Sequence, residues 1–509
     1  MIAPVFESDD AESTSPAQAG IRAIFEWLAA PPPLHPADEL LPLRTHLAAL
    51  HEAAAPAHRH ASALEQLYTR SISVVDQLIP IFKNVTLPIP RKTRHIVRSM
   101  QDLLQTLAED MLASQEKLDE HLIRGLRQTR DLTLWRSLHA LAQHLLISDM
   151  VASPPSAGIW QQLHRAFATA NRAELADSRP DGALSSLRQV YYTALLLGCA
   201  QPASFTSQEI AFVADYLKRY ADRAEPIPEA VPESHGIFWI HSLHDTPPFA
   251  CSRKTAPPDP DVYFFSCDKL ATLLDRQLDA LEAGSTPQQT NLPEFAGTPA
   301  GQGVLRRLAN YWGHPGKRRF PRRRQNYRAV MCSGLDSLWH LFQDDQASEN
   351  DVSNWMITNE SPDGYTTMHV SGKTGKLRVG DIAAIRTESG KIWQICLVRW
   401  ALSENPEHLE LGLQVLASRA VPAILALTPE TGNRDNNALL PVLILPEIPA
   451  LRPSQSLITP SGALVDHQNK LVLIVNQNNV EVREMRATKL EEQTGSIEIF
   501  SIRPDEQPD

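Results

Sequence analysis

The spacing of apolar residues predicts that the first half of the chain is mostly helical. Between residues 37 and 220, leucines and aromatic residues recur every three or four positions, which is the spacing of one helix face. Thr206 followed by Glu209 forms a capping-box pattern, so a helix is expected to follow and to run to Tyr220. Two such apolar faces are Leu132, Trp135, Leu138, Leu141, Leu145 and Leu184, Leu187, Tyr191, Leu195. The pattern predicts an antiparallel bundle or an irregular solenoid of helix pairs.

A proline-rich stretch ends this helical region. Pro226, Pro228 and Pro232 lie close together and indicate a boundary. Beyond it, residues 236–240 and 262–265 have the composition of short strands, whereas residues 269–283 and 304–312 have helical spacing. The pattern therefore predicts a mixed α/β segment that connects two larger parts of the chain.

Short strand-like runs dominate the chain after residue 364. They cover residues 365–370, 376–387, 391–402 and 408–416. Glycines expected at turns separate them, at Gly372, Gly375, Gly380 and Gly390. These runs predict a small antiparallel β-barrel. Further runs at 441–445, 471–475 and 495–502 predict a small β-rich unit that either extends the barrel or forms a docking surface.

The expected fold class is a multidomain α+β protein, in which an all-α bundle or solenoid precedes an antiparallel β-barrel and a small C-terminal β unit. A length of 509 residues is too great for one ordinary core. The expected segments are a disordered N-terminus at 1–20, a helical domain at 21–225, a connecting segment at 226–311, the barrel at 312–421, a β-rich extension at 422–504 and an acidic tail at 505–509.

Composition favours a soluble protein of the cytoplasm. No run reaches the ~18 apolar residues of a spanning helix, so we expect no membrane insertion. Glu7, Asp9 and Asp10 replace the cationic and apolar regions of a signal peptide. The five cysteines are scattered, at Cys199, Cys251, Cys267, Cys332 and Cys396, which favours reduced thiols over disulfides or a zinc site. We therefore expect no metal.

Candidate binding chemistry lies in two segments of the barrel region. The basic run at residues 317–324 contains Arg-x-x-x-Arg, best assigned to Arg318 and Arg322. Residues 359–364 contain Asn-x-Ser-x-x-Gly, with Asn359, Ser361 and Gly364. A guanidinium can hold phosphate oxygens or a guanine edge with two parallel hydrogen bonds, and it can stack on a purine. The amide and the hydroxyl can each donate and accept, and the glycine would let the backbone turn tightly.

This pair of segments resembles the signature of PilZ domains, bacterial receptors for cyclic di-GMP. Residues 411–415, in which a glycine lies among apolar residues, also look like the closing strand of such domains. The resemblance covers about residues 312–421 and implies that cyclic di-GMP is the ligand. By position, the binding residues would be Arg318, Arg322, Asn359, Ser361 and Gly364, with additional phosphate contacts from Arg319, Arg323, Arg324 and Arg328.

The family also implies a mechanism. Its asparagine and serine lie on a strand and the following turn, and its arginines lie on a linker that wraps around the dinucleotide. Binding would thus order the segment from Arg318 to Arg328. This chain departs from the family pattern in a longer gap between the two segments, where an acidic insert with Asp344, Asp345, Glu349 and Asp351 is expected to form a loop.

Other functions fit the sequence less well. The basic run could contact nucleic acid, but a net charge of −11 opposes general polyanion binding and no nucleic-acid-binding module accompanies the run. The sequence Gly372-Lys373-Thr374 is expected to be a hairpin turn and not a phosphate-binding loop. The histidine group at His51, His58 and His60 is expected to be a solvated face, and His235, His241, His244 and Asp245 stay ambiguous. No catalytic pattern is specific enough to predict an enzyme.

The favoured function is that of a non-catalytic effector, in which nucleotide binding at the barrel is coupled to contacts between the helical domain and an unidentified protein partner. The alternative is a degenerate barrel that serves as a scaffold or adaptor and binds protein partners without nucleotide.

Overall fold

The computed structural model describes residues 16–53, 57–118, 129–229, 235–316, 320–344, 352–374, 377–405, 408–426, 439–448, 453–464, 470–476 and 480–505. The disorder expected for the N-terminus concerns residues 1–15, which lie outside this part, as do most of the acidic insert and of the acidic tail. Residues 16–20 belong to a helix, so the helical region begins earlier than position 21.

The chain divides into two compact units. The first unit comprises Met1–Pro80, Ile96–His144 and Ala166–Leu187, and the second comprises Ile81–His95, Leu145–Arg165 and Arg188–Asp509. The boundary between the units therefore runs within the helical region, and the second unit takes in some of its segments.

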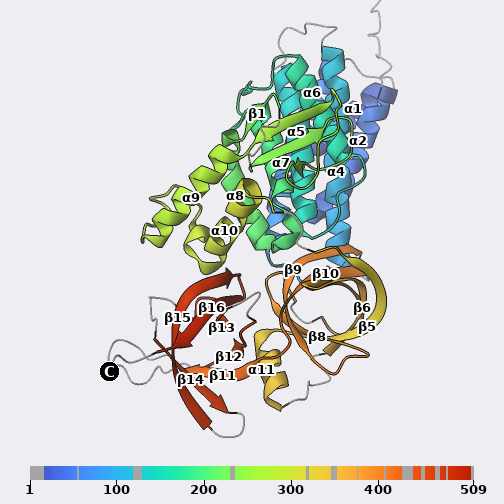
Figure 1. Cartoon of the computed structure of the whole chain (residues 1–509). Helices are drawn as coiled ribbons and strands as arrows, with labels where there is room; N and C mark the ends of the chain where they lie inside the picture. The colour runs from blue at the N-terminus through green and yellow to red at the C-terminus, as the bar shows by residue number, and fades with distance from the viewer. Residues whose placement is uncertain are drawn as a thin grey trace, which may run out of the picture. The chain divides into compact units, whose positions relative to one another are not determined.

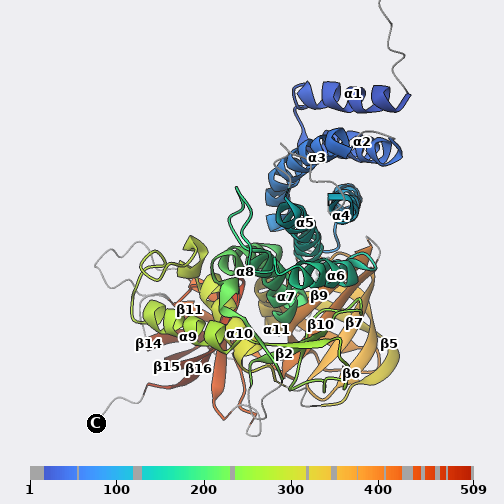
Figure 2. The same cartoon turned by 90° about the horizontal axis from the view of Figure 1, so that it is seen from above.

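Helices form the N-terminal part, as the apolar spacing predicts. They are α1 (Pro16–Ala29), α2 (Leu40–Glu52), α3 (Ala57–Leu78), α4 (Arg91–Leu118), α5 (Arg130–Met150), α6 (Ile159–Arg172), α7 (Leu187–Cys199) and α8 (Ser207–Tyr220). The helices α1, α2 and α3 pack on one another (Figure 2). Leucines at helical spacing, including Leu43, Leu47 and Leu50 of α2, are fully buried.

The capping box at the start of α8 is confirmed. The Glu209 N–H donates to Thr206 Oγ1 at 3.3 Å, and the Thr206 N–H donates to Glu209 Oε2 at 2.7 Å. Because both bonds satisfy N–H groups that a helix start leaves unpaired, α8 begins at Ser207. Arg307 Nη2 then pairs with the other oxygen of Glu209 at 2.5 Å.

The mixed segment contains the expected strands and helices. A small antiparallel sheet has the order β1-β4-β2-β3. Its strands are β1 (Glu225–Ile227), β2 (Ile237–His241), β3 (Phe249–Ala250) and β4 (Val262–Ser266). Two helices follow, α9 (Asp268–Glu282) and α10 (Pro299–Gly313). Trp312 near the end of α10 is fully buried, and its indole donates to the Leu196 carbonyl at 3.1 Å, which anchors α10 on α7.

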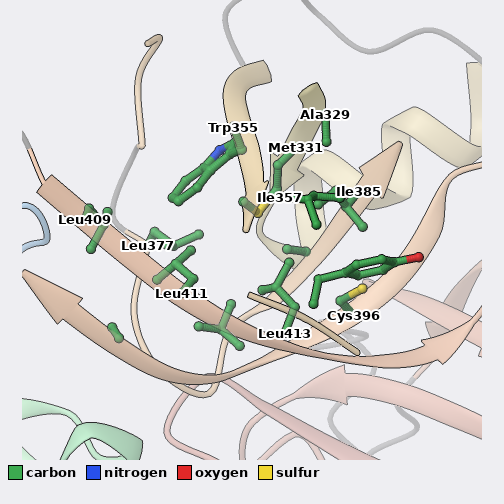
Figure 3. Close-up of a cluster of buried hydrophobic side chains, with 14 of the residues drawn as sticks. Ala329, Met331, Trp355, Ile357, Leu377, Ile385, Cys396, Leu409, Leu411 and Leu413 are labelled. Atoms are coloured by element: carbon green, nitrogen blue, oxygen red, sulfur yellow. The ribbon is translucent and has the colours of Figure 1, made fainter. Parts of the chain in front are cut away.

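The first barrel is a closed antiparallel ring in the order β10-β7-β6-β5-β8-β9 (Figure 1). Its strands are β5 (Arg323–Ser333), β6 (Val352–Ser361), β7 (Gly364–Ser371), β8 (Ile382–Thr387), β9 (Gln394–Asn405) and β10 (His408–Ala417). Alternate side chains point inward, so Trp355, Ile357, Leu411 and Leu413 meet in one core (Figure 3). This confirms the barrel that the strand-like runs predict.

Two parts of the barrel differ from the expectation. The segment from Arg323 to Arg328 is not a linker but the first half of β5, which pairs with both β6 and β8. A helix that the sequence does not predict, α11 (Leu335–Asp344), follows β5 in the gap between the two motifs and ends at Asp344, the first residue of the acidic insert. Leu338 and Leu341 of α11 are buried, and their spacing of three residues is that of a helix face.

A second closed barrel forms the C-terminal part, in the order β11-β12-β13-β16-β15-β14. Its strands are β11 (Val421–Ala426), β12 (Leu439–Leu445), β13 (Gln455–Pro460), β14 (Lys470–Asn476), β15 (Val480–Gln493) and β16 (Ile497–Pro504). It has its own core around Leu425, Val442 and Leu473. The expected small β unit is thus a complete barrel.

A shared apolar layer joins α11 to one side of each barrel. It contains Ile382 and Ile395 of the first barrel, Leu338 of α11, and Leu443 and Ile499 of the second barrel, all buried. The outer side of β8 and of the start of β9 is thereby covered. The polar residues of the second motif lie on β6 and β7, on a different side of the first barrel.

Candidate ligand-binding face

The motif Asn-x-Ser-x-x-Gly forms the hairpin that joins β6 to β7. Ser361 pairs with Gly364, and Pro362 and Asp363 form the turn between them. Ser361 Oγ contacts Asp363 Oδ1 at 2.6 Å and the Gly364 carbonyl at 3.2 Å. These bonds hold the serine hydroxyl at the hairpin, where it is partly exposed.

Gly364 is needed for a close approach between strands. A Cβ at this position would lie 2.1 Å from the Leu413 carbonyl oxygen of β10. The φ of Gly364 is not in the left-handed region. The expectation that this glycine serves a tight turn is therefore replaced by a steric reason, because only a residue without Cβ lets β7 and β10 pair here.

Strand register brings the motif residues to one outer face of the barrel. Residues directly opposite each other in antiparallel strands point to the same side. Arg324 of β5 lies opposite Asn359 of β6, and Asn359 lies opposite Thr366 of β7. On the alternate side, Ile357 lies opposite Thr367, and Ile357 belongs to the barrel core. Asn359 therefore points outward, and Ser361, two residues further along, shares its side.

Arg322 reaches this outer face. Its Nη1 donates to Thr366 Oγ1 at 3.3 Å, while most of its side chain stays exposed. Thr366 is the register partner of Asn359. The Arg322 guanidinium therefore lies next to the pair formed by Asn359 of β6 and Thr366 of β7. The structure thus brings Arg322 together with Asn359, Ser361 and Gly364.

The remaining predicted arginines are divided. Arg318 and Arg319 lie outside the described residues. Arg324, opposite Asn359, and Arg328, opposite Met356, lie on the outer face and are exposed. Arg323 lies opposite Glu360, on the alternate side of the strand. Of the four arginines predicted to make additional phosphate contacts, Arg324 and Arg328 therefore lie on the same outer face as Asn359.

Glu360 follows Asn359 on β6 and lies opposite Tyr365, a residue of the barrel core, so it is on the alternate side of the strand. Its Oε2 accepts hydrogen bonds from Tyr327 OH at 3.0 Å and from Gln325 Nε2 at 3.3 Å. Burial, together with the nearby Glu360 carboxylate, raises the pKa of Tyr327 well above its ordinary value. The phenol consequently stays protonated and can donate to the Glu360 carboxylate.

Sequence reasoning missed two residues of this face, Thr366 and Trp400. Thr366 is 4% exposed, and its hydroxyl oxygen accepts the hydrogen bond from Arg322. Trp400 of β9 lies opposite Gly412 of β10, which in turn lies opposite Thr366. No local motif marks either residue. Only the register of four strands places them on this face, and in that register Gly412 leaves room for the large side chain of Trp400.

Metal chemistry has no candidate in the described part of the chain, where no group of three or more His, Cys, Asp or Glu could hold an ion. His51 faces the carboxylate of Asp110 at 3.4 Å. His241 and His244 stack on each other, and Asp245 accepts hydrogen bonds from the Gly158 and Trp160 N–H groups at the start of α6. Across the described residues, no helix is long and apolar enough to span a bilayer.

Comparisons with known proteins agree with this architecture. Residues 22–229 match the family model "Cyclic-di-GMP receptor FimW, N-terminal domain", residues 340–422 match "Cyclic-di-GMP receptor FimW, middle PilZ domain", and residues 425–504 match "FimW C-terminal beta-barrel domain". The match to the middle domain begins after the arginine segment. The cyclic-di-GMP receptor FimW of Pseudomonas aeruginosa is 22% identical to this chain over 94% of the chain and 89% of the relative's length.

The three matches follow one another in the same order as the helical part and the two barrels of the structure. The chain therefore belongs to the PilZ domain family, with its PilZ barrel between a helical N-terminal domain and a second, C-terminal barrel.

Proposed function

We propose that this protein binds cyclic di-GMP on the outer face of its first barrel, over β6, β7 and β10, and that it acts as a non-catalytic effector. The observation that carries the proposal is the convergence of Arg322, Asn359 and Ser361 on that face. The relative of the same domain order, named a cyclic-di-GMP receptor, supports the choice of ligand.

The residue types of the face suit the two parts of the ligand. Arg322, with Arg318 and the outward Arg324 and Arg328, would supply cationic groups for the two phosphates. Asn359 and Ser361 can each donate and accept, so they can pair with the polar edge of a guanine. The turn carbonyl of Asp363 already accepts from the Val415 N–H at 2.9 Å, which ties this hairpin to β10.

In the proposed mechanism, the ligand draws Arg318 toward the face that already holds Arg322. Since β5 begins at Arg323, the moving part is confined to the residues before it. The ligand shifts the equilibrium only by its differential affinity for the closed arrangement. The helical domain would then pass this change to a protein partner in the cytoplasm.

Isothermal titration with cyclic di-GMP tests the proposal, with GTP as the ligand control. We expect saturable binding that Arg322→Ala, Asn359→Ala and Ser361→Ala each weaken about tenfold or more, because each loses a hydrogen bond to a charged or buried group. Arg503→Ala, an exposed arginine of the second barrel, is the matched control. No binding by the wild-type protein would favour the ligand-independent scaffold.

A further inference from the structure

Arg399 occupies an irregularity in the strand pairing of the first barrel. In the pairing of β9 with β10, Trp400 lies opposite Gly412 and Val398 lies opposite Leu413, so Arg399 is an extra residue on β9. Such a β-bulge leaves one residue without a cross-strand partner and re-aims its side chain. The side chain of Arg399 is therefore directed by its own contacts and not by the alternation of the strand.

The Arg399 guanidinium joins the two barrels. Its Nε donates to Gln414 Oε1 of β10 at 2.5 Å, and its Nη2 donates to Glu492 Oε2 of β15 at 2.7 Å. The side chains of Arg399 and Glu492 are 38% and 18% exposed. An ion pair that is partly shielded from water is screened less by salt than a fully exposed one. One cation thus binds both a residue of the PilZ barrel and a carboxylate of the second barrel.

Gln414 belongs to the same outer face as the second motif. It lies opposite Gly364 of β7, which lies opposite Ser361 of β6. Leu413 belongs to the barrel core, so Gln414 points outward. Adjacent strands are about 4.8 Å apart, so two strand spacings, about 10 Å, separate Ser361 from Gln414. This distance is comparable with the Debye length at physiological ionic strength, so the charges of the ion pair act on an anion bound at the face.

The residue after Glu492 ties the second barrel to helix α10. Gln493 is 9% exposed, and its Oε1 accepts a hydrogen bond from Arg306 Nη1 of α10. Arg306 Nη2 in turn pairs with Glu282 Oε1 of α9 at 2.8 Å. A Cβ on Gly303 of α10 would lie 2.4 Å from the Gln493 carbonyl oxygen, so the helix and the strand are in backbone contact. Because this contact is close-packed, a movement of Glu492 would displace α10 as well.

Separate contacts keep the two barrels together when the ion pair opens. Thr494 Oγ1, at the turn between β15 and β16, donates to the Gly380 carbonyl of the first barrel at 2.9 Å. The apolar layer shared with α11 involves neither charged residue of the pair. Opening of the pair is therefore a local change at the end of β15 and not a separation of the barrels.

We propose that the ion pair between Arg399 and Glu492 couples ligand binding on the outer face to the second barrel and to α10. The inference rests on the proposed function, since it assigns the regulation of the same site. A ligand with two phosphates attracts the guanidinium and repels the carboxylate, so it weakens the pair. Linkage is reciprocal, so a protein that lacks the carboxylate of the pair binds the ligand more tightly. Arg399 is thus a positioning residue that acts through Glu492.

Hydrogen exchange of the full-length protein with and without cyclic di-GMP tests the coupling. In the wild-type protein, the ligand should raise exchange in residues 491–498 by about 1.5-fold to 5-fold, the range that corresponds to a partly exposed ion pair. This rise should be absent in Glu492→Gln and in Arg399→Gln, although both still bind, because the pair is already lost. Glu484→Gln removes the same charge from an exposed position of β15 and should keep the wild-type response.

Isothermal titration gives a second readout. Glu492→Gln should bind cyclic di-GMP about 1.5-fold to 5-fold more tightly than the wild-type protein, whereas Glu484→Gln should match the wild-type protein. The gain from Glu492→Gln should shrink when Arg399→Gln is also present, because no guanidinium is then released. An equal gain with and without Arg399 would show that charge alone, and not the ion pair, acts on the ligand, and it would overturn the coupling.

The outcomes also distinguish this inference from the proposed function. Ligand binding that leaves exchange in residues 491–498 unchanged or lowers it, or an equal rise in Glu492→Gln, would retain the receptor and reject the coupling. Absence of binding by the wild-type protein would reject both.

Discussion

At the scale of residues, the two glycines of the outer face act by allowing close approach. Gly364 lets β7 approach the Leu413 carbonyl, and Gly412 lets the Trp400 indole lie on β10. Neither has a left-handed backbone. The glycine of the motif is thus explained by strand packing, and its effect on ligand binding would be indirect.

Gly364→Ala should destabilise the first barrel by about 1 to 3 kcal/mol, because a Cβ located 2.1 Å from a backbone oxygen forces the strands apart. Hydrogen exchange of β7 and β10 measures the effect locally. Gly316→Ala is the control, since a Cβ there meets nothing within 4 Å and the φ is ordinary. Unchanged exchange in Gly364→Ala would show that the close approach is not needed.

A second prediction at this scale concerns Asp149, which lines a cavity with Thr206 and Arg378. Burial raises the pKa of Asp149 to about 8 from 3.8. A carboxyl whose folded-state pKa is raised stabilises the fold below the unfolded pKa of about 4, and this contribution is lost as pH rises through the folded value. Asp149→Asn should therefore flatten the fall in stability between these values.

The measurement for Asp149 is thermal unfolding as a function of pH. Asp215→Asn, which removes a carboxyl at an exposed position of α8, is the matched control. A wild-type profile that is already flat between pH 4 and 8 would contradict the raised pKa.

The part of the candidate site that lies within one short stretch of sequence could be predicted. Asn359, Ser361 and Gly364 are close in sequence, so their spacing alone indicates one strand and one turn. Trp400 and Thr366 join the face only through the pairing of four strands, and such register depends on bulges like the one between Ile357 and Asn359. No local pattern encodes this register.

At the scale of elements, the sequence does not predict β5 and β6, the two strands of the first barrel that carry polar residues of the candidate face. β5 begins with two arginines, which fit a solvated linker equally well, and its apolar residues start at Tyr327. The sequence does not predict the helix α11 because its leucines lie in the gap between the two motifs, next to acidic residues that favour a loop. Long helices and glycine-bounded strands were predicted because their apolar periodicity is strong.

The cap of α8 gives a prediction for one element. Thr206→Ala removes the hydroxyl that accepts from the Glu209 N–H, and it should cost about 1 kcal/mol. Because several domains need not unfold together, hydrogen exchange in the first turn of α8 is the appropriate measurement. Ser207→Ala is a useful comparison, since its hydroxyl donates to the Met150 carbonyl and does not cap the helix. An equal effect of both changes would contradict the capping role.

At the scale of the whole molecule, the two barrels share an apolar layer with α11. Ile499 of the second barrel is 3% exposed and belongs to that layer together with Ile382 and Ile395 of the first barrel. Arg399 of the first barrel also pairs with Glu492 of the second at 2.7 Å. The second barrel therefore braces the PilZ barrel through this layer and this ion pair.

Ile499→Ala should destabilise both barrels, since deleting a buried branched side chain costs about 2 to 5 kcal/mol and its neighbours come from both. Hydrogen exchange is expected to increase in β8 and β9 as well as in β13 and β16. Val482→Ala, at a side chain that is 61% exposed, should have little effect. A change confined to the second barrel would show that the layer does not couple the two.

The measurement that tests the central claim most directly is isothermal titration of the full-length protein with cyclic di-GMP, repeated with the double variant Arg318→Ala/Arg322→Ala. The account predicts saturable binding to the wild-type protein that the double variant loses, with no heat from GTP. Absence of binding to the wild-type protein at high ligand concentration, or binding that survives in the double variant, would contradict it.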